Sequence, residues 1–194
     1  MGRPPAHSVD DFIDAAVRLF ATGGARAVTM SSVAREVGAP SGSIYHRFAD
    51  RPTLLSAVWL RTTRRFERGL GEVLEARPPV ESAIAACGWT VDWCRENVQQ
   101  AIVLHAGARA FSPETWPADA REALAAHNAA LNSRIVQLAR DLAAETGRRS
   151  DEVAFTLFDL PLAVVRRYLV SGDPPPARAT SLVTRLARRI LAEG

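Results

Sequence analysis

The sequence of 194 residues contains no lysine, so all 24 of its basic residues are arginine. Cysteine is nearly absent as well, with only Cys87 and Cys94, and there are four histidines. None of these has the close spacing of zinc ligands, which predicts no metal site and no cofactor. The two cysteines are seven positions apart in a helical pattern, and the roughly 10 Å between them is too far for a disulfide. We interpret both as reduced core residues, with a thiol-sensing role as the alternative.

Long apolar runs are also missing. No stretch approaches the roughly 20 apolar residues of a membrane-spanning helix, and the N-terminal segment "MGRPPAHSVDD" lacks the apolar part of a secretory signal. The composition is ordinary for a globular protein, with 47% apolar and 23% charged residues. These absences predict a cytoplasmic protein with no membrane partner. A net charge of only +3 gives weak support for nucleic-acid binding, so that function needs a local pattern.

The common catalytic motifs are absent too. The sequence has no GxSxG, no HExxH and no glycine-rich phosphate loop. Its histidines and acids are not paired along the chain in a way that indicates acid-base chemistry. We therefore predict no catalytic residues and no enzyme activity, and we keep a small enzyme as an alternative.

What the sequence does contain is helical periodicity from end to end, which predicts an all-α fold. No alternation of apolar and polar residues argues for a strand. Helices are expected to begin at the capping residues Ser8, Thr29, Ser41 and Asp50, and a helix is expected to stop at Gly23–Gly24. The spans after Ser8 are 29–38, 41–48, 50–76, 80–95, 97–110, 118–146, 151–171 and 177–193.

The segment "GAPSGSIYHRF", Gly38 to Phe48, is unusual among these helices. Ile44 and Phe48 are its only large inward groups, and Gly42 lies in a helical turn, where glycine costs roughly 1 kcal/mol relative to alanine. Two short helices joined by a glycine-containing turn form a helix-turn-helix, whose second helix enters the DNA major groove. A helix pressed into a groove needs little core of its own, and glycine allows close approach of its backbone. A surface helix with scattered polar residues is the plainer interpretation.

The stretch from Phe12 to Val58 resembles the N-terminal domain of tetracycline-repressor-like (TetR family) regulators, most specifically in "VAREVGAPSGSIYHRF". The resemblance implies a three-helix DNA-binding domain over residues 8–55, with the helix-turn-helix at about 29–48. A helical ligand-binding and dimerisation domain would follow over residues 56–194. Arg51 stands where the family usually has a lysine, and Pro52 next to it has no amide hydrogen. The expected DNA contacts, to which Arg47 is added for its reach to phosphates, are Thr29, Ser41, Gly42, Ser43, Tyr45, His46, Arg47 and Arg51.

The rest of the chain predicts a ligand site and a dimer interface. His105 and Arg109 are four apart in an expected helix, and a polar pair beside aromatic residues is typical of a mostly apolar ligand site. Packing of these aromatics in the core is the alternative. The predicted ligand-binding residues are Trp89, Trp93, His105, Arg109, Phe111, Trp116, His127, Phe155 and Phe158. The resemblance implies that the last two helices form a two-fold interface, and core plus lid of a monomer is the alternative. The expected interface residues are Leu157, Val164, Tyr168, Leu182, Leu186 and Ile190.

These features and the family resemblance together predict a homodimeric transcriptional regulator. The resemblance implies a repressor released from a two-fold symmetric operator in double-stranded DNA by a small-molecule effector, with an activator as the alternative. The alternative from another class is a helical protein-binding module that does not touch DNA. The sequence does not give the operator, the regulated genes, the effector or the direction of regulation.

Overall fold

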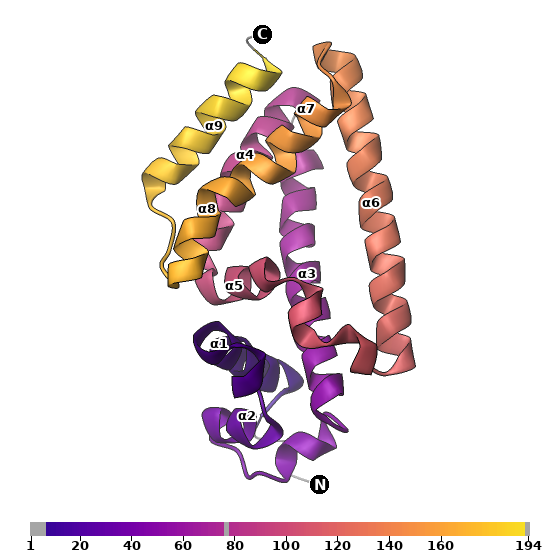
Figure 1. The fold of residues 1–194 in the computed structure, drawn as a ribbon, viewed down its shortest axis with the longest axis vertical. Helices are drawn as coiled ribbons and strands as arrows, with labels where there is room; N and C mark the ends of the chain where they lie inside the picture. The colour runs from indigo at the N-terminus through magenta and orange to yellow at the C-terminus, as the bar shows by residue number, and fades with distance from the viewer. Residues whose placement is uncertain (1–6, 76–77, 193–194) are drawn as a thin grey trace, which may run out of the picture. The chain divides into compact units, whose positions relative to one another are not determined.

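A computed structural model of the chain describes residues 7–75 and 78–192, and no strand occurs among them (Figure 1). The predicted all-α fold is thus confirmed. None of the described helices is both long enough and apolar enough to cross a membrane. The elements are α1 (Val9–Ala27), α2 (Met30–Val37), η1 (Ser43–His46), α3 (Arg51–Glu75), α4 (Pro79–Glu96), α5 (Val98–Ala106), η2 (Ala108–Phe111), η3 (Pro113–Thr115), α6 (Ala118–Thr146), α7 (Ser150–Ala154), η4 (Phe155–Asp159), α8 (Leu160–Ser171) and α9 (Ala177–Leu191).

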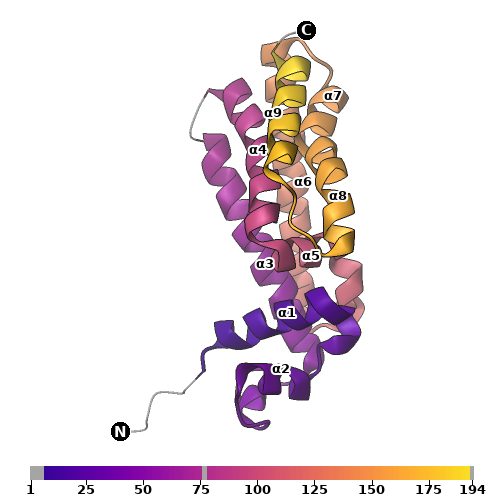
Figure 2. The same ribbon diagram turned by 90° about the vertical axis from the view of Figure 1, so that its left-hand side faces the viewer.

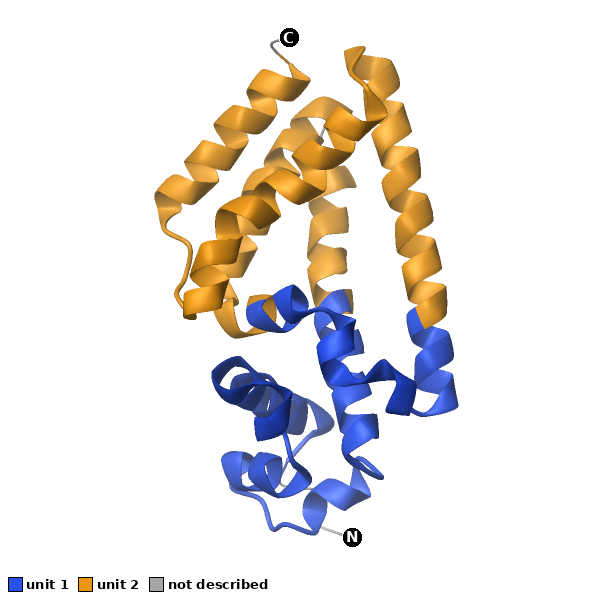
Figure 3. Cartoon of the chain, viewed as in Figure 1, with its two compact units in different colours: residues 1–63, 102–124 blue, residues 64–101, 125–194 orange. Residues whose placement is uncertain are grey.

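The chain divides into two compact units (Figure 3). Unit 1 contains residues 1–63 and 102–124, and unit 2 contains residues 64–101 and 125–194. The helices α3 and α6 each contribute residues to both units. This structural division differs from the predicted functional boundary at residue 55, which stays a prediction.

Unit 1 has an aromatic core. Phe111, from a single turn of 3-10 helix, is fully buried and stacks on Phe20 with ring centroids 4.4 Å apart. Trp59 lies beside the same ring at 5.6 Å, and Trp116 is buried with its indole N–H donated to the Phe111 carbonyl at 2.8 Å. Residues 102–124 therefore complete the core of the N-terminal helices.

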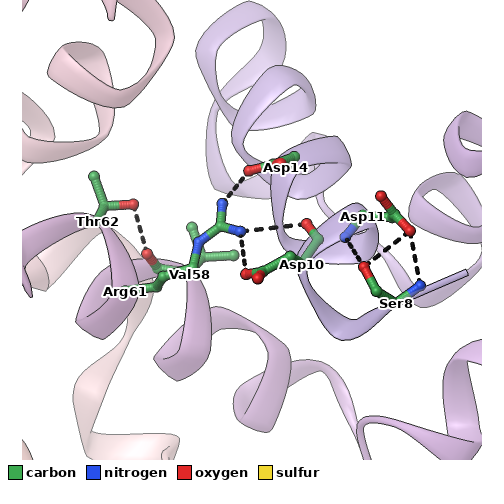
Figure 4. Close-up of polar contacts among 7 residues, drawn as sticks. All are labelled: Ser8, Asp10, Asp11, Asp14, Val58, Arg61 and Thr62. Atoms are coloured by element: carbon green, nitrogen blue, oxygen red, sulfur yellow. Dashed lines mark hydrogen bonds and ion pairs between the residues drawn. The ribbon is translucent and has the colours of Figure 1, made fainter. Parts of the chain in front are cut away.

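Within unit 1, Arg61 joins α3 to α1 (Figure 4). Its guanidinium donates to the Asp10 carboxylate at 2.7 Å and also to the carboxylate of Asp14. The arginine side chain is only 14% exposed, whereas both aspartates are substantially open to solvent. The pairs thus fix the contact between two helices while one partner of each stays hydrated.

Unit 2 contains a close packing of α4 against α8 and α9, with α9 running back alongside α4 (Figures 1 and 2). At Gly88 an added Cβ would lie 2.8 Å from the Thr184 hydroxyl. A larger residue at this position would require the Thr184 side chain to move, so glycine favours the close contact of the two helices.

Two glycines of unit 1 set helix boundaries, and the sequence predicted one of them. The predicted helix over 97–110 ends at Ala106, because Gly107 adopts φ 74° and ψ 161°, a backbone region that is almost reserved for glycine. The predicted stop at Gly23–Gly24 is confirmed, since Gly24 leaves helical geometry at φ 64°, but one more turn follows to Ala27.

The predicted helix over 151–171 is interrupted. A π-helical turn over Phe155–Asp159 separates α7 from α8. Pro161, which has no amide hydrogen to donate, lies in the first turn of α8. The interruption shifts the register of the side chains before and after it.

Candidate nucleic-acid interface and ligand pocket

The third helix is shorter and tighter than the sequence predicted. It is one turn of 3-10 helix over Ser43–His46 rather than an α-helix from Ser41. The Ser43 amide and hydroxyl both donate to the Pro40 carbonyl, at 2.9 and 2.7 Å. These contacts close the turn early, and Gly42 at φ −74° leads into it with helical geometry.

The two faces of this turn are divided as predicted. Ile44 and Phe48 are buried, at 0% and 3% exposure. On the other side Tyr45 is 58% exposed, and His46 and Arg47 are also exposed. Ser41 and Gly42 are open to solvent and Ser43 is half-buried. Among the described residues of unit 1, none covers this polar and aromatic surface, which we call the recognition face: Ser41, Gly42, Ser43, Tyr45, His46 and Arg47.

Capping residues hold the helices on both sides of the recognition face. The Thr29 hydroxyl accepts from the Ser32 amide at 3.0 Å, and the Ser32 hydroxyl accepts from the Thr29 amide at 2.9 Å. Asp50 accepts from the amide and hydroxyl of Thr53. Both hydrogen bonds lower the pKa of the Asp50 carboxyl, so this N-cap stays ionised and aligned with the dipole of α3.

Arg51, for which the resemblance implies a phosphate contact, forms hydrogen bonds within unit 1 in this structure. Its Nε donates to the Val28 carbonyl at 2.7 Å and one Nη to the Ala25 carbonyl at 2.6 Å. The Ala25 carbonyl also accepts from the Val28 amide at 3.2 Å, which closes the end of α1. The guanidinium adds a charged donor to the Ala25 carbonyl and another to that of Val28, so in this structure Arg51 braces the α1–α2 connection.

Sequence reasoning missed Ser31 as a candidate for the same surface. It is exposed in the first turn of α2, and its hydroxyl lies 3.2 Å from that of Thr29. The sequence could have indicated Ser31, because it lies two residues after the predicted N-cap Thr29 and therefore at the same end of the helix. A hydroxyl there can donate to a phosphate oxygen beside the helix amides.

Unit 2 contains a pocket of about 340 Å³ between α3 and α6. Apolar side chains dominate its wall, with charged groups among them. The lining residues are Glu67, Leu70, Gly71, Leu74, Glu75, Leu131, Arg134, Ile135, Gln137, Leu138, Asp141 and Phe158.

Of the predicted ligand-binding residues, Phe158 alone belongs to the lining of this pocket. Trp89 and Trp93 pack with Phe66, at centroid distances of 5.4 and 5.0 Å. Phe155 is 51% exposed on the surface. His127 lies at the edge of the site, where its Nε2 is 2.8 Å from the Glu67 carboxylate.

The remaining predicted ligand-binding residues lie in unit 1. His105 and Arg109 are exposed and do not share a helix face, because Gly107 ends α5 between them. Their predicted pairing is therefore wrong. Phe111 and Trp116 are core residues, as the alternative interpretation of the aromatics held.

The predicted interface residues on α8 and α9 differ in exposure. Leu182 is exposed, and Val164, Tyr168, Leu186 and Ile190 are half-buried. Leu157 is 7% exposed in its own unit. Sequence reasoning missed two exposed apolar residues of α8, Leu162 at 50% and Val170 at 72% exposure.

Both cysteines are free and buried, as predicted. Burial raises the pKa of each thiol to about 12. The Cys87 thiol donates to the Thr156 carbonyl at 3.3 Å. Because the thiolate is the reactive form, neither side chain suits thiol sensing in the folded state.

Residues 12–58 match the family described as bacterial regulatory proteins of the tetR family. No curated protein sequence matches the chain closely enough to be counted as a relative. The sequence resemblance to TetR regulators is thus confirmed for the N-terminal segment.

Solved structures extend the likeness in fold to nearly the whole chain. A TetR-like transcriptional regulator from Rhodococcus sp. RHA1 has a TM-score of 0.71 and 20% identity, with all of both chains covered. The ketosteroid regulator KstR2 of Mycobacterium tuberculosis has a TM-score of 0.73 and 17% identity, covering 97% of this chain and 95% of its own. FadR from Bacillus subtilis, solved with stearoyl-CoA, has a TM-score of 0.69 and 15% identity, with coverages of 95% and 98%. The chain therefore has the fold of these regulators.

Proposed function

We propose that the protein is a ligand-responsive DNA-binding transcriptional regulator, acting in the cytoplasm as a repressor that a small molecule releases from its operator. The recognition face carries the proposal. Its hydroxyl, aromatic, imidazole and guanidinium groups project to solvent from a turn anchored by Ile44 and Phe48. These are groups that contact phosphates and base edges in a major groove.

A homodimer is part of this proposal. Exposed apolar side chains on α8 and α9, among them Val170 and Leu182, are costly to leave in water and suit a partner surface. Two copies related by a two-fold axis would present two recognition faces to successive major grooves, about 34 Å apart. Light scattering at micromolar concentration is expected to give the mass of a dimer, and a monomer would contradict this part.

Release by a ligand follows from linkage between two sites. A ligand that binds better to the conformation unsuited to DNA lowers DNA affinity, and DNA lowers ligand affinity by the same factor. The continuous helix α3 contributes residues to unit 1 from Arg51 and to the pocket of unit 2 from Glu67. It is the element through which we expect the two sites to be coupled.

The test is selection of bound sequences from random duplex DNA at fixed salt. We expect enrichment of a two-fold symmetric site whose half-sites are separated by about one helical turn. Tyr45→Ala and His46→Ala should each weaken binding to that site roughly tenfold or more, by loss of 1–3 kcal/mol of base or phosphate contact.

His105→Ala serves as the matched control for His46→Ala, because His105 is exposed in the same unit but lies on α5. Circular dichroism should show that all three variants are folded. If no sequence is enriched, or if the Tyr45 and His46 variants bind like the parent chain, the protein-binding module becomes the better interpretation.

A further inference from the structure

The pocket of unit 2 has an excess of negative charge in its lining. Among the described residues that line it are the carboxylates of Glu67, Glu75 and Asp141 and one cationic side chain, Arg134. From this we infer that the pocket binds a small hydrophobic amine, a ligand with an apolar body and a positively charged head. The inference rests on the proposed function in treating the pocket as the effector site.

The apolar part of the wall sets the shape of the ligand's body. The helices α3 and α6 run in the same direction on the two sides of the pocket (Figures 1 and 2). Leu70 and Leu74 are one turn apart on α3, and Leu131, Ile135 and Leu138 recur at the same helical spacing on α6. Two facing apolar stripes suit an elongated aliphatic or aromatic body. A pocket of about 340 Å³ lies at the small end of the range for ligand sites.

At one end of the pocket the polar groups already have partners. The Glu67 carboxylate is 22% exposed and lies 2.8 Å from His127 Nε2. Burial raises the pKa of the Glu67 carboxyl, and the nearby charges of His127 and Arg134 act in the opposite direction. The single guanidinium also reaches toward α3, since one Nη of Arg134 lies 3.6 Å from the position of a Cβ on Gly71. Arg134 therefore lies close enough for its charge to act on Glu67, while the carboxylate itself is paired with His127.

At the other end the carboxylates are open to a ligand. Glu75 is eight residues beyond Glu67 on α3, which is about 12 Å along the helix. Glu75 and Asp141 are both exposed. Asp141 accepts a hydrogen bond from Gln137 at 2.7 Å. Within the part of the chain that the structure describes, no hydrogen bond or ion pair of Glu75 is present. An ammonium head would be attracted by both carboxylates while the ligand's body lay along the apolar stripes.

The same distribution of charge disfavours an anionic ligand. A carboxylate or phosphate head would meet either the exposed Glu75 and Asp141 or an arginine whose charge already acts on Glu67. FadR from Bacillus subtilis, a protein of similar fold, was solved with stearoyl-CoA, whose phosphates carry several negative charges. We therefore expect this chain to bind a different class of ligand despite the similar fold, because the lining of its pocket is negatively charged.

The experiment compares three probes with one apolar body: octylammonium, octanol and octanoate. Isothermal titration calorimetry on the full chain at fixed pH and salt gives the three affinities. We expect octylammonium to bind at least tenfold more tightly than octanoate, with octanol between them. The double variant Glu75→Gln/Asp141→Asn should remove most of that preference. Glu72→Gln is the matched control, because Glu72 is an exposed carboxylate of α3 outside the lining, and it should bind all three probes like the parent chain.

Several results would overturn the inference. Tighter binding of octanoate, absence of octylammonium binding, or an unchanged preference in the double variant would each do so. DNA binding is measured on the same preparation, so the two proposals fail separately. A chain that binds its selected DNA but not octylammonium refutes the amine site alone. A chain that binds octylammonium through Glu75 and Asp141 but selects no DNA refutes the regulator and keeps the site.

Discussion

The aromatic core of unit 1 and the region between α3 and α6 of unit 2 differ in how closely they are packed. In unit 1, Phe12, Phe111 and Ile44 are fully buried, and the rings of Phe20 and Phe111 stack in direct contact. In unit 2, the part of α6 from residue 125 onward buries only Ala139 and Leu142, and a pocket remains between this helix and α3.

This difference is what the two proposed tasks require. A surface that reads DNA must hold its groups in fixed positions, and a core packed without voids resists deformation. A ligand site needs unfilled volume with apolar walls, which a closely packed core does not offer. The contrast agrees with the two proposed functions, and substitutions in each unit can test it.

The largest effect on stability is expected from a substitution that opens a cavity in the core of unit 1. Phe111→Ala removes a fully buried ring that contacts Phe20 and Trp59. We expect the free energy of unfolding, measured by urea denaturation, to fall by about 3–5 kcal/mol. Phe155→Ala is the control, since Phe155 is 51% exposed and should change stability by less than about 1 kcal/mol. Similar losses for both variants would show that unit 1 is not the better packed part.

A smaller difference in stability is expected between substitutions of two arginines of unit 1. Arg51→Ala leaves the carbonyls of Ala25 and Val28 without their charged donor, and we expect a loss of about 2 kcal/mol in unfolding free energy. Arg47→Ala changes an exposed side chain and should alter stability by less than about 0.5 kcal/mol. It should instead reduce the salt dependence of DNA affinity by about one phosphate contact.

The two arginine variants are compared by urea denaturation and by DNA titration over a range of salt concentrations. If Arg51→Ala is as stable as the parent chain and loses the phosphate contact, the side chain moves to DNA in the complex. The role implied by the family would then hold in place of the bracing role.

The smallest effect on stability is expected from a substitution that fills the pocket of unit 2. Leu138→Phe adds volume to the wall of the pocket and should cost less than about 1 kcal/mol, because empty space receives the ring. Val33→Phe at a fully buried position of unit 1 should cost about 1–3 kcal/mol through overpacking. Thermal unfolding of both variants measures the difference. Equal costs would mean that the side chains around the pocket cannot accept added volume.

Local features of the candidate interface could be predicted from the sequence. Ile44 and Phe48 are buried and Tyr45 and His46 are exposed, because helical periodicity alone fixes which residues share a side. The caps at Thr29 and Asp50 were predictable for a similar reason, since each acts within three residues of its own position. These features were predictable because each depends on residues that are close together in the sequence.

The errors concern backbone conformation and distant contacts. Gly107 could have continued the helix between His105 and Arg109, and its positive φ is what separates them. Nothing near Arg51 in the sequence indicates its bonds to Ala25 and Val28, which lie more than twenty residues earlier in the chain. Such contacts exist only after the helices have packed.

By itself the sequence determined the all-α class, the helix-turn-helix and the sides of its third helix, since periodicity, caps and breakers act over a few residues. Only the tertiary structure decided that Phe111 and Trp116 complete the core of unit 1 and that the pocket lies between α3 and α6. The reason is physical: a cavity belongs to the space between elements, and its walls are chosen by packing rather than by any one segment.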